Sequence, residues 1–149
     1  DGTARWHTAP TSRQVLYPKA TTDSINLGAS SWGRTNLEPG DEIVVSTMEH
    51  HSNIVPWQMV CDERGARLRV IPVFDSGELD MAAYSELLND RTRLVAVTHV
   101  SNTLGTINPV SDLVRLAHDA GALVLLDGAQ ALPHLRIDVQ QLDADFYAF

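Results

Sequence analysis

Cysteine is almost absent from this sequence of 149 residues, which contains only Cys61. One cysteine excludes an internal disulfide framework, so a reducing compartment is the simplest expectation. No apolar run approaches the roughly 18–20 residues that a membrane-spanning helix needs. The first residues also lack the basic start and apolar stretch of a signal peptide. Together these absences predict a soluble, cytoplasmic chain.

Positive charge is scarce as well. The sequence has 11 Lys and Arg against 19 Asp and Glu, a formal net charge of -8. Nucleic-acid-binding surfaces and polybasic membrane patches need clustered Lys and Arg, so neither partner is expected. Neither G-x-G-x-x-G nor G-x-x-x-x-G-K-[ST] occurs, so dinucleotide and P-loop sites lack their motifs. With 44% hydrophobic residues, the chain can nevertheless fill a core.

Short apolar runs alternate with amphipathic segments along the chain. The expected strands are 14–17, 42–46, 67–72, 93–98, 123–126 and a last run ending at Phe149. The expected helices are 22–37, 53–64, a short segment after Asp80, and 110–120. Hydroxyl side chains and Asn53 are the expected helix caps, and Gly65 and Gly121 the expected ends. This order predicts an α/β fold with a mostly parallel sheet and flanking helices.

The two ends of the chain differ from its middle. Residues 1–13 are polar and show no clear periodicity, which indicates a tail or an interrupted element. Residues 145–149 look like a strand, and the sequence stops inside it. An α/β enzyme places a functional loop beyond such a strand. We therefore expect residues 14–149 to be part of a larger domain.

Polar residues follow four of the expected strands where each one ends. They are Lys-Ala-Thr-Thr at 19–22, Thr-Met-Glu-His-His-Ser-Asn at 47–53, His-Val-Ser-Asn at 99–102 and Asp-Gly-Ala-Gln at 127–130. Because parallel strands end at one edge of a sheet, these residues should share that edge. The convergence predicts a ligand site there.

Several of these residues have two open interpretations. Thr21 and Thr22 suit either a phosphate at a helix start or a plain helix cap. Asp127 follows a buried apolar run, so its carboxylate needs a partner. That partner is either a protonated ring nitrogen, which would make the ring an electron sink, or the start of the next helix.

The histidines and amides allow further alternatives. Glu49, His50, His51 and His99 could form a metal site, or one histidine could stack on a planar cofactor and act as acid or base. Asn102 and Gln130 can each fix a ligand carboxylate or a phenolic oxygen. Cys61 occupies an apolar-looking helix position and is interpreted as a core thiol.

Four stretches of the sequence resemble the cysteine desulfurases, which are pyridoxal 5'-phosphate (PLP) enzymes of the class V aminotransferase superfamily. They are Ala-Thr-Thr-Asp-Ser-Ile-Asn-Leu at 20–27, Met-Glu-His-His-Ser-Asn-Ile-Val-Pro-Trp at 48–57, Thr-His-Val-Ser-Asn-Thr-Leu-Gly at 98–105 and Asp-Gly-Ala-Gln-Ala at 127–131. The second stretch most resembles the group II branch, the SufS and selenocysteine lyase type. The resemblance runs from about residue 14 to residue 149 and implies part of the large domain of a fold-type I PLP enzyme.

The resemblance implies a role for each matching residue. The hydroxyl of Thr22, with the backbone around Thr21, would hold the cofactor phosphate. His50 would stack on the pyridine ring and assist proton transfer, and Asp127 would pair with the pyridinium nitrogen. Gln130 would bond the phenolic oxygen. In the same scheme, Asn102 contacts the substrate carboxylate.

The sequence departs from the family in two places. Lys19-Ala20 stands where the family usually has Arg-Gly before the paired threonines, and a Cβ there can loosen the approach of the backbone to a phosphate. The family also continues into a Ser-Gly-His-Lys loop, whose lysine binds the cofactor covalently, and on to a persulfide-forming cysteine. This sequence ends before both, so we expect no desulfurase turnover from the chain alone.

The resemblance therefore implies a piece of a homodimeric enzyme that converts L-cysteine to L-alanine. Such an enzyme passes sulfur to an acceptor protein for iron–sulfur cluster assembly or another sulfur pathway. Three alternatives remain open: a selenocysteine lyase or other class V enzyme, a metal-binding module, and a non-catalytic interaction fragment.

Overall fold

A computed structural model describes residue 16 and residues 18–149 of the chain. The expected tail at 1–13 and most of the expected strand at 14–17 lie outside the described residues. Leu16 belongs to no helix or strand. None of the helices in the described part is long and apolar enough to cross a membrane.

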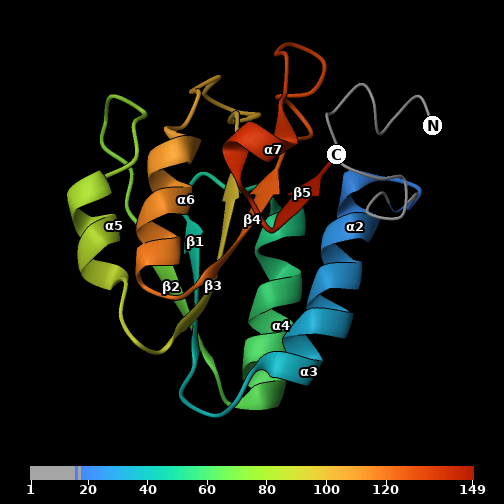
Figure 1. Cartoon of the computed structure of the whole chain (residues 1–149), viewed down its shortest axis with the longest axis vertical. Coiled ribbons are helices and arrows are strands. Elements are labelled where there is room, and N and C mark those ends of the chain that lie inside the picture. The colour runs from blue at the N-terminus through green and yellow to red at the C-terminus, as the bar shows by residue number, and fades with distance from the viewer. Residues whose placement is uncertain (1–15, 17) are drawn as a thin grey trace.

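Five parallel strands form a single sheet in the order β2-β1-β3-β4-β5 (Figure 1). The strands are β1 Glu42–Ser46, β2 Arg67–Ile71, β3 Thr92–Thr98, β4 Leu123–Asp127 and β5 Phe146–Ala148. In this register Thr98 at the end of β3 lies beside Asp127 at the end of β4. The predicted α/β fold with a parallel sheet is confirmed, and β1 has the expected bounds.

Helices cover both faces of the sheet (Figure 1). They are α2 Thr21–Gly28, η2 Ala29–Gly33, α3 Arg34–Asn36, η3 His51–Asn53, α4 Val55–Arg64, α5 Met81–Leu87, α6 Val110–Asp119 and α7 Val139–Leu142. Residues of α2, η2 and α4 pack on one face, and residues of α5 and α6 pack on the other. The result is a three-layer arrangement with the sheet in the middle.

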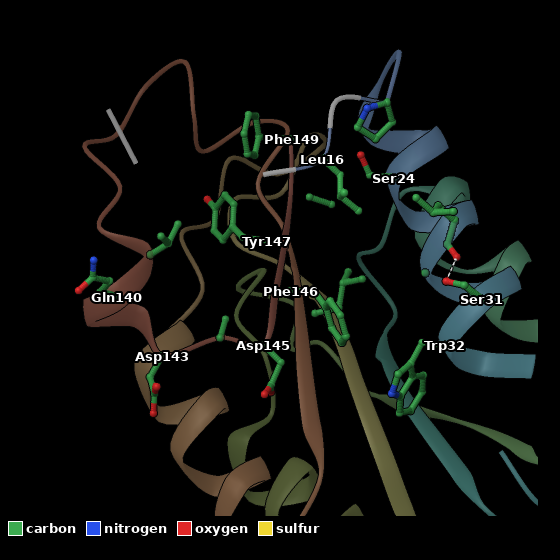
Figure 2. A pocket seen from close by; sticks show the side chains of 17 residues that line it. Leu16, Ser24, Ser31, Trp32, Gln140, Asp143, Asp145, Phe146, Tyr147 and Phe149 are labelled. Carbon is green, nitrogen blue, oxygen red and sulfur yellow. Dashed lines mark hydrogen bonds between the residues drawn. The ribbon is translucent and has the colours of Figure 1, made fainter. Parts of the chain in front are cut away.

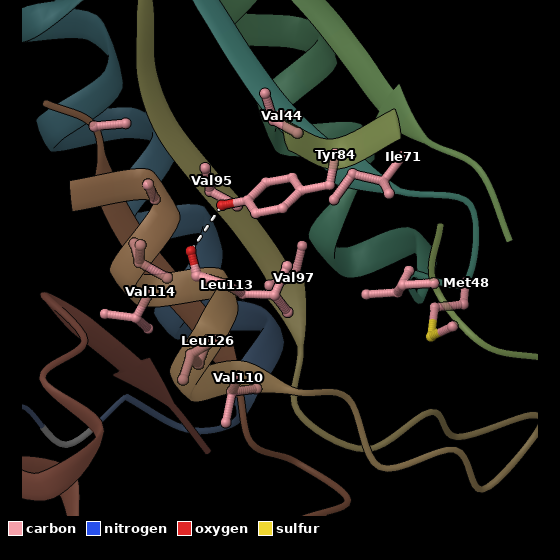
Figure 3. Packing of buried hydrophobic residues seen from close by; sticks show 14 residues of the cluster. Val44, Met48, Ile71, Tyr84, Val95, Val97, Val110, Leu113, Val114 and Leu126 are labelled. Atoms are coloured by element: carbon pink, nitrogen blue, oxygen red, sulfur yellow. Dashed lines mark hydrogen bonds between the residues drawn. The ribbon is translucent and has the colours of Figure 1, made fainter. Parts of the chain in front are cut away.

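The core consists of two clusters because successive strand residues point to opposite faces. Val95 and Leu126 pack with α5 and α6, as Figure 3 shows, whereas Leu94 belongs to the opposite cluster with Trp57 of α4. Strands buried on both faces need apolar residues at nearly every position, which explains the continuous apolar runs. The hydroxyl of the fully buried Tyr84 donates to the carbonyl of Leu113 at 2.8 Å.

The predicted end of one helix and the predicted start of another are confirmed. Gly65 ends α4 with a φ of 69°, in the left-handed region that favours glycine. The carboxylate of Asp80 accepts a hydrogen bond from the amide of Ala83 and so caps α5. These ends depend on local backbone geometry, which explains why a pattern of residues could locate them.

Two expected caps are wrong. The cap position of α2 is Ala20, and no side chain caps this helix, because Thr21 and Thr22 already lie within its first turn. Asn53 does not cap α4 either, since its buried side chain bonds to Glu49 and Trp57 instead. For Asn53, tertiary contacts therefore override a local preference.

The helix expected at 22–37 is interrupted by the π-helical segment η2. The hydroxyls of Ser30 and Ser31 both donate to the carbonyl of Leu27, at 3.2 and 2.5 Å. Serine side chains that bond to preceding carbonyls compete with the helical ladder, and this competition accompanies the locally wider turn.

Candidate active site

The carboxyl ends of the strands meet at one edge of the sheet, as expected for parallel strands. The amide of His99, just past β3, donates to the carbonyl of Asp127 at 2.8 Å. The amide of Gly128 donates in turn to the carbonyl of Ala148 at 2.7 Å, so β3, β4 and β5 end together. Helix α2 begins at the same end of the molecule (Figure 1).

Asp127 is the buried acidic residue at this edge. Its side chain is the last of β4, and the residue is 5% exposed. Burial raises the pKa of its carboxyl group, while the amide of Ala129 and the charge of His50 partly offset this rise. The amide of Ala129 donates to Oδ1 at 3.0 Å, and Oδ2 accepts no hydrogen bond from any residue that the structure describes.

The alternative in which Asp127 caps a helix is wrong. Turns follow β4, and the next helix in the described chain is α7, which begins at Val139. Asp127 instead forms a short side-chain turn with the amide two residues ahead. A buried carboxylate with one oxygen left over suits a charged hydrogen-bond donor on a ligand.

His50 follows β1 and lies near this carboxylate. Because the charge of a protonated His50 lowers the pKa of Asp127, the two groups are close enough to interact. The His50 Nδ1 accepts a hydrogen bond from the amide of Ser52 and lies 2.9 Å from the Ser52 hydroxyl. The neutral ring therefore carries its proton on Nε2. The residue is exposed.

Glu49 is occupied by protein donors, which argues against the metal-site interpretation. Its carboxylate accepts hydrogen bonds from the hydroxyl of Ser46, the amide of Thr98 and the side chain of Asn53. In the described part of the chain, no group of three or more histidine, cysteine or acidic side chains is placed to hold a metal ion.

Thr21 and Thr22 lie at the start of α2. Neither hydroxyl has a hydrogen-bond partner among the described residues, and the first amide bonded within this turn is that of Ser24, to the carbonyl of Ala20. The amides before it are left unpaired by the helix. Free amides and hydroxyls at a helix start attract a phosphate.

Asn102 and Gln130 lie in the loops after β3 and β4. Both side chains are exposed, and neither contacts the other candidate residues through a hydrogen bond in the described structure. The structure therefore brings His50 and Asp127 together with the start of α2 at one end of the molecule, and it leaves the two amides in neighbouring loops.

The sequence comparison adds the decisive observation: the model of the class-V aminotransferase family matches residues 1–149, the whole chain. The chain belongs to the class-V aminotransferase family.

Three proteins of known sequence or structure are similar to this chain. The cysteine desulfurase of Dickeya dadantii is 57% identical over 141 residues, which cover 95% of this chain and 34% of that protein. The crystal structure of the cysteine desulfurase CsdA from Escherichia coli superposes with a TM-score of 0.94 at 40% identity and covers 97% of this chain and 36% of that one.

The third is the cystine C-S lyase C-DES, at 25% identity. Its structures superpose with TM-scores of 0.87 and 0.86; they contain glycine covalently linked to PLP in one case and the reaction product cysteine persulfide in the other. These alignments cover 99% of this chain and 39% of C-DES. The class-V chain thus spans about a third of the length of the first two relatives.

Gly128 and Tyr147 lie at the site, and the sequence pattern did not predict a role for either of them. The ring of Tyr147 covers Gly128 so closely that an added Cβ would lie 2.1 Å from its Cε1 atom. The Tyr147 hydroxyl lies 3.0 Å from Nδ1 of His99, whose pKa is lowered by burial. A glycine directly after the buried Asp127 was the available signal, because it indicates close approach of another group.

An apolar groove lies beside the candidate site and not on it. It has a volume of about 490 Å³ and runs between α2, η2 and β5, as Figure 2 shows. Leu27, Trp32 and Phe146 line it, together with Tyr147. None of the candidate cofactor or substrate residues lines this groove.

Proposed function

We propose that this chain forms the cofactor-binding part of a PLP-dependent cysteine desulfurase. The observation that carries the proposal is the buried carboxylate of Asp127, which has one oxygen without a hydrogen-bond partner among the described residues. A positively charged ring nitrogen fits this oxygen, because a charge-assisted hydrogen bond offsets the cost of burying the carboxylate. The similarity to cysteine desulfurases over nearly the whole chain supports the same conclusion.

Each residue of the site has a part in holding the cofactor. The hydroxyl of Thr22 and the amides around Thr21 bind the phosphate at the start of α2. His50 stacks on the ring, and its Nε2 proton is available for transfer. Asp127 keeps the ring nitrogen protonated, and Gln130 binds the phenolic oxygen. When bound, PLP supplies an electron sink for the bonds at the substrate carbon.

The substrate of this proposal is L-cysteine, whose carboxylate Asn102 binds. The products are L-alanine and sulfur transferred to an acceptor protein. C-DES, which holds cysteine persulfide, supports sulfur chemistry on this fold. By family resemblance, the proposal extends to a cytoplasmic, homodimeric, group II enzyme that serves iron–sulfur cluster assembly.

Binding of pyridoxamine 5'-phosphate tests the proposal, because this amine form needs no lysine to be held. Amide signals of Thr22, His50 and Asp127 should shift in NMR titrations. Pyridoxamine without the phosphate should bind more weakly. Asp127→Asn should weaken binding about 10- to 100-fold, since it removes a hydrogen bond to a charged group.

Asp62→Asn is the matched control, because Asp62 is an exposed carboxylate on α4. It should bind like the parent chain. Equal affinities of the Asp127→Asn and Asp62→Asn variants would contradict the proposal. Signal shifts confined to the groove beside β5 would contradict it as well.

A further inference from the structure

Glu49 joins the ends of two strands. Its Oε1 accepts a hydrogen bond from the hydroxyl of Ser46, the last residue of β1, at 2.5 Å. The same oxygen accepts a hydrogen bond from the amide of Thr98, the last residue of β3, at 3.0 Å. One buried carboxylate oxygen therefore connects the carboxyl ends of neighbouring strands.

The second oxygen of Glu49 connects these strands to the helical layer. Its Oε2 accepts a hydrogen bond from Nδ2 of Asn53 at 2.7 Å, and Oδ1 of Asn53 accepts one from Nε1 of Trp57 at 3.0 Å. Asn53 and Trp57 are almost completely buried. The last two steps each span four residues, and with the bond from Thr98 they make a continuous line of hydrogen bonds from β3 to the core side of α4.

His50 lies between Glu49 and Asn53 in the chain, and both of these residues belong to the network. The side chain of His50 is itself exposed, and its ring is held by the amide of Ser52, which lies within η3. Burial raises the pKa of the Glu49 carboxyl group, and the charge of Asp127 adds to this rise, so the two carboxylates interact. Among the described residues, Asp127 is the charged group that acts on it.

We propose that Glu49 is a positioning residue of the cofactor site, which sets the place of His50 relative to Asp127. The inference rests on the proposed function. Glu49 touches neither cofactor nor substrate, and it acts through the segment that carries the stacking ring. A carboxylate suits this position because it accepts all three hydrogen bonds at once, whereas an amide has only one accepting atom.

Glu49→Gln tests the positioning role. The new amide nitrogen would face the donor of Asn53, which leaves two donors opposed in a buried place. We expect the His50 ring signals to shift in the ligand-free protein, and the dissociation constant of pyridoxamine 5'-phosphate to rise about tenfold. Both are measured by NMR at a temperature where circular dichroism shows the variant folded.

A double variant provides the rescue. In Glu49→Gln with Asn53→Asp, the amide at position 49 donates to a carboxylate at position 53, which also accepts the hydrogen bond from Trp57. All donors then have acceptors again. The His50 signals should return toward their parental positions, and the affinity should recover to within about threefold.

The matched control is Glu63→Gln, which changes an exposed glutamate of α4 that pairs with Arg34. It should leave both readouts unchanged. Unchanged His50 signals in a folded Glu49→Gln variant, or failure of the folded double variant to recover them, would overturn the proposal. Should Glu49→Gln not fold, Ser46→Ala removes one of the three donors, and the His50 signals must then shift.

The two readouts separate this inference from the proposed function. The His50 signals need no ligand, so they report positioning even if pyridoxamine 5'-phosphate does not bind. Absence of binding by the parent chain would contradict the proposed function. Normal binding by the parent chain, with no response to Glu49→Gln in either readout, would contradict only the positioning role.

Discussion

At the scale of single residues, space and hydrogen-bonding capacity explain which side chains the site contains. Gly128 does not need glycine for its backbone angles, because its φ is not among the positive values. It needs glycine because the Tyr147 ring occupies the position of a side chain. This contact keeps the Tyr147 hydroxyl within hydrogen-bond distance of His99, which closes the edge of the sheet beside Asp127.

Gly128→Ala should therefore destabilise the protein. The added Cβ would displace the Tyr147 ring and break its contact with His99, and overpacking of this kind costs about 1–3 kcal/mol. Equilibrium unfolding in urea measures the loss. Gly28→Ala is the control, since a Cβ at Gly28 meets its nearest atom only at 3.7 Å. A Gly128→Ala variant as stable as the parent would contradict the account.

At the scale of elements, local signals decide where helices begin and end, while longer contacts decide how they are used. Gly65 and Asp80 act within a few residues of themselves, through a left-handed turn and a side-chain cap. Asn53 has the chemistry of a cap but is recruited by Glu49 and Trp57. When a residue suits two local roles, the residues around it in the folded structure decide which role it takes.

Asp80→Ala should lower the free energy of unfolding by about 1 kcal/mol, because α5 loses the carboxylate that accepts from Ala83. Urea unfolding at constant pH checks the value. Asp90→Ala serves for comparison, as it removes an exposed carboxylate from the turn before β3. If both variants lose the same stability, the cap contributes nothing specific.

At the scale of the whole molecule, burial of ionisable groups links stability to pH. Burial raises the pKa of Glu49 from 4.5 to about 7, despite three hydrogen bonds that favour its charged form. Between these values the folded chain retains a proton that the unfolded chain releases. This group therefore favours folding less as the pH rises from 4.5 to 7, by about 3 kcal/mol in total.

The stability of the parent chain should fall more steeply across this pH range than that of Glu49→Gln, which does not titrate there. Urea unfolding at several pH values measures both profiles. His99 has a lowered pKa and contributes the opposite slope, and Asp127 has a raised pKa and contributes the same slope as Glu49. Both are present in both proteins, so the difference between the profiles reports Glu49 together with its interaction with Asp127. Parallel profiles would contradict the burial of an ionisable Glu49.

The sequence by itself determined the parallel sheet, the bounds of β1 and the helix ends at Gly65 and Asp80. These features follow from apolar runs and from backbone preferences, which act over a few residues. The same pattern also predicted that polar residues would gather where the strands end, since parallel strands share a direction.

Only the tertiary structure decided the hydrogen-bond line through Glu49 and the closure of Tyr147 over Gly128. Glu49 and Thr98 are 49 positions apart, and Tyr147 and His99 are 48 apart. The physical reason is that a carboxylate, an amide or a hydroxyl has many possible partners in a sequence. Which of them it meets depends on how the strands align, and burial then makes that pairing obligatory.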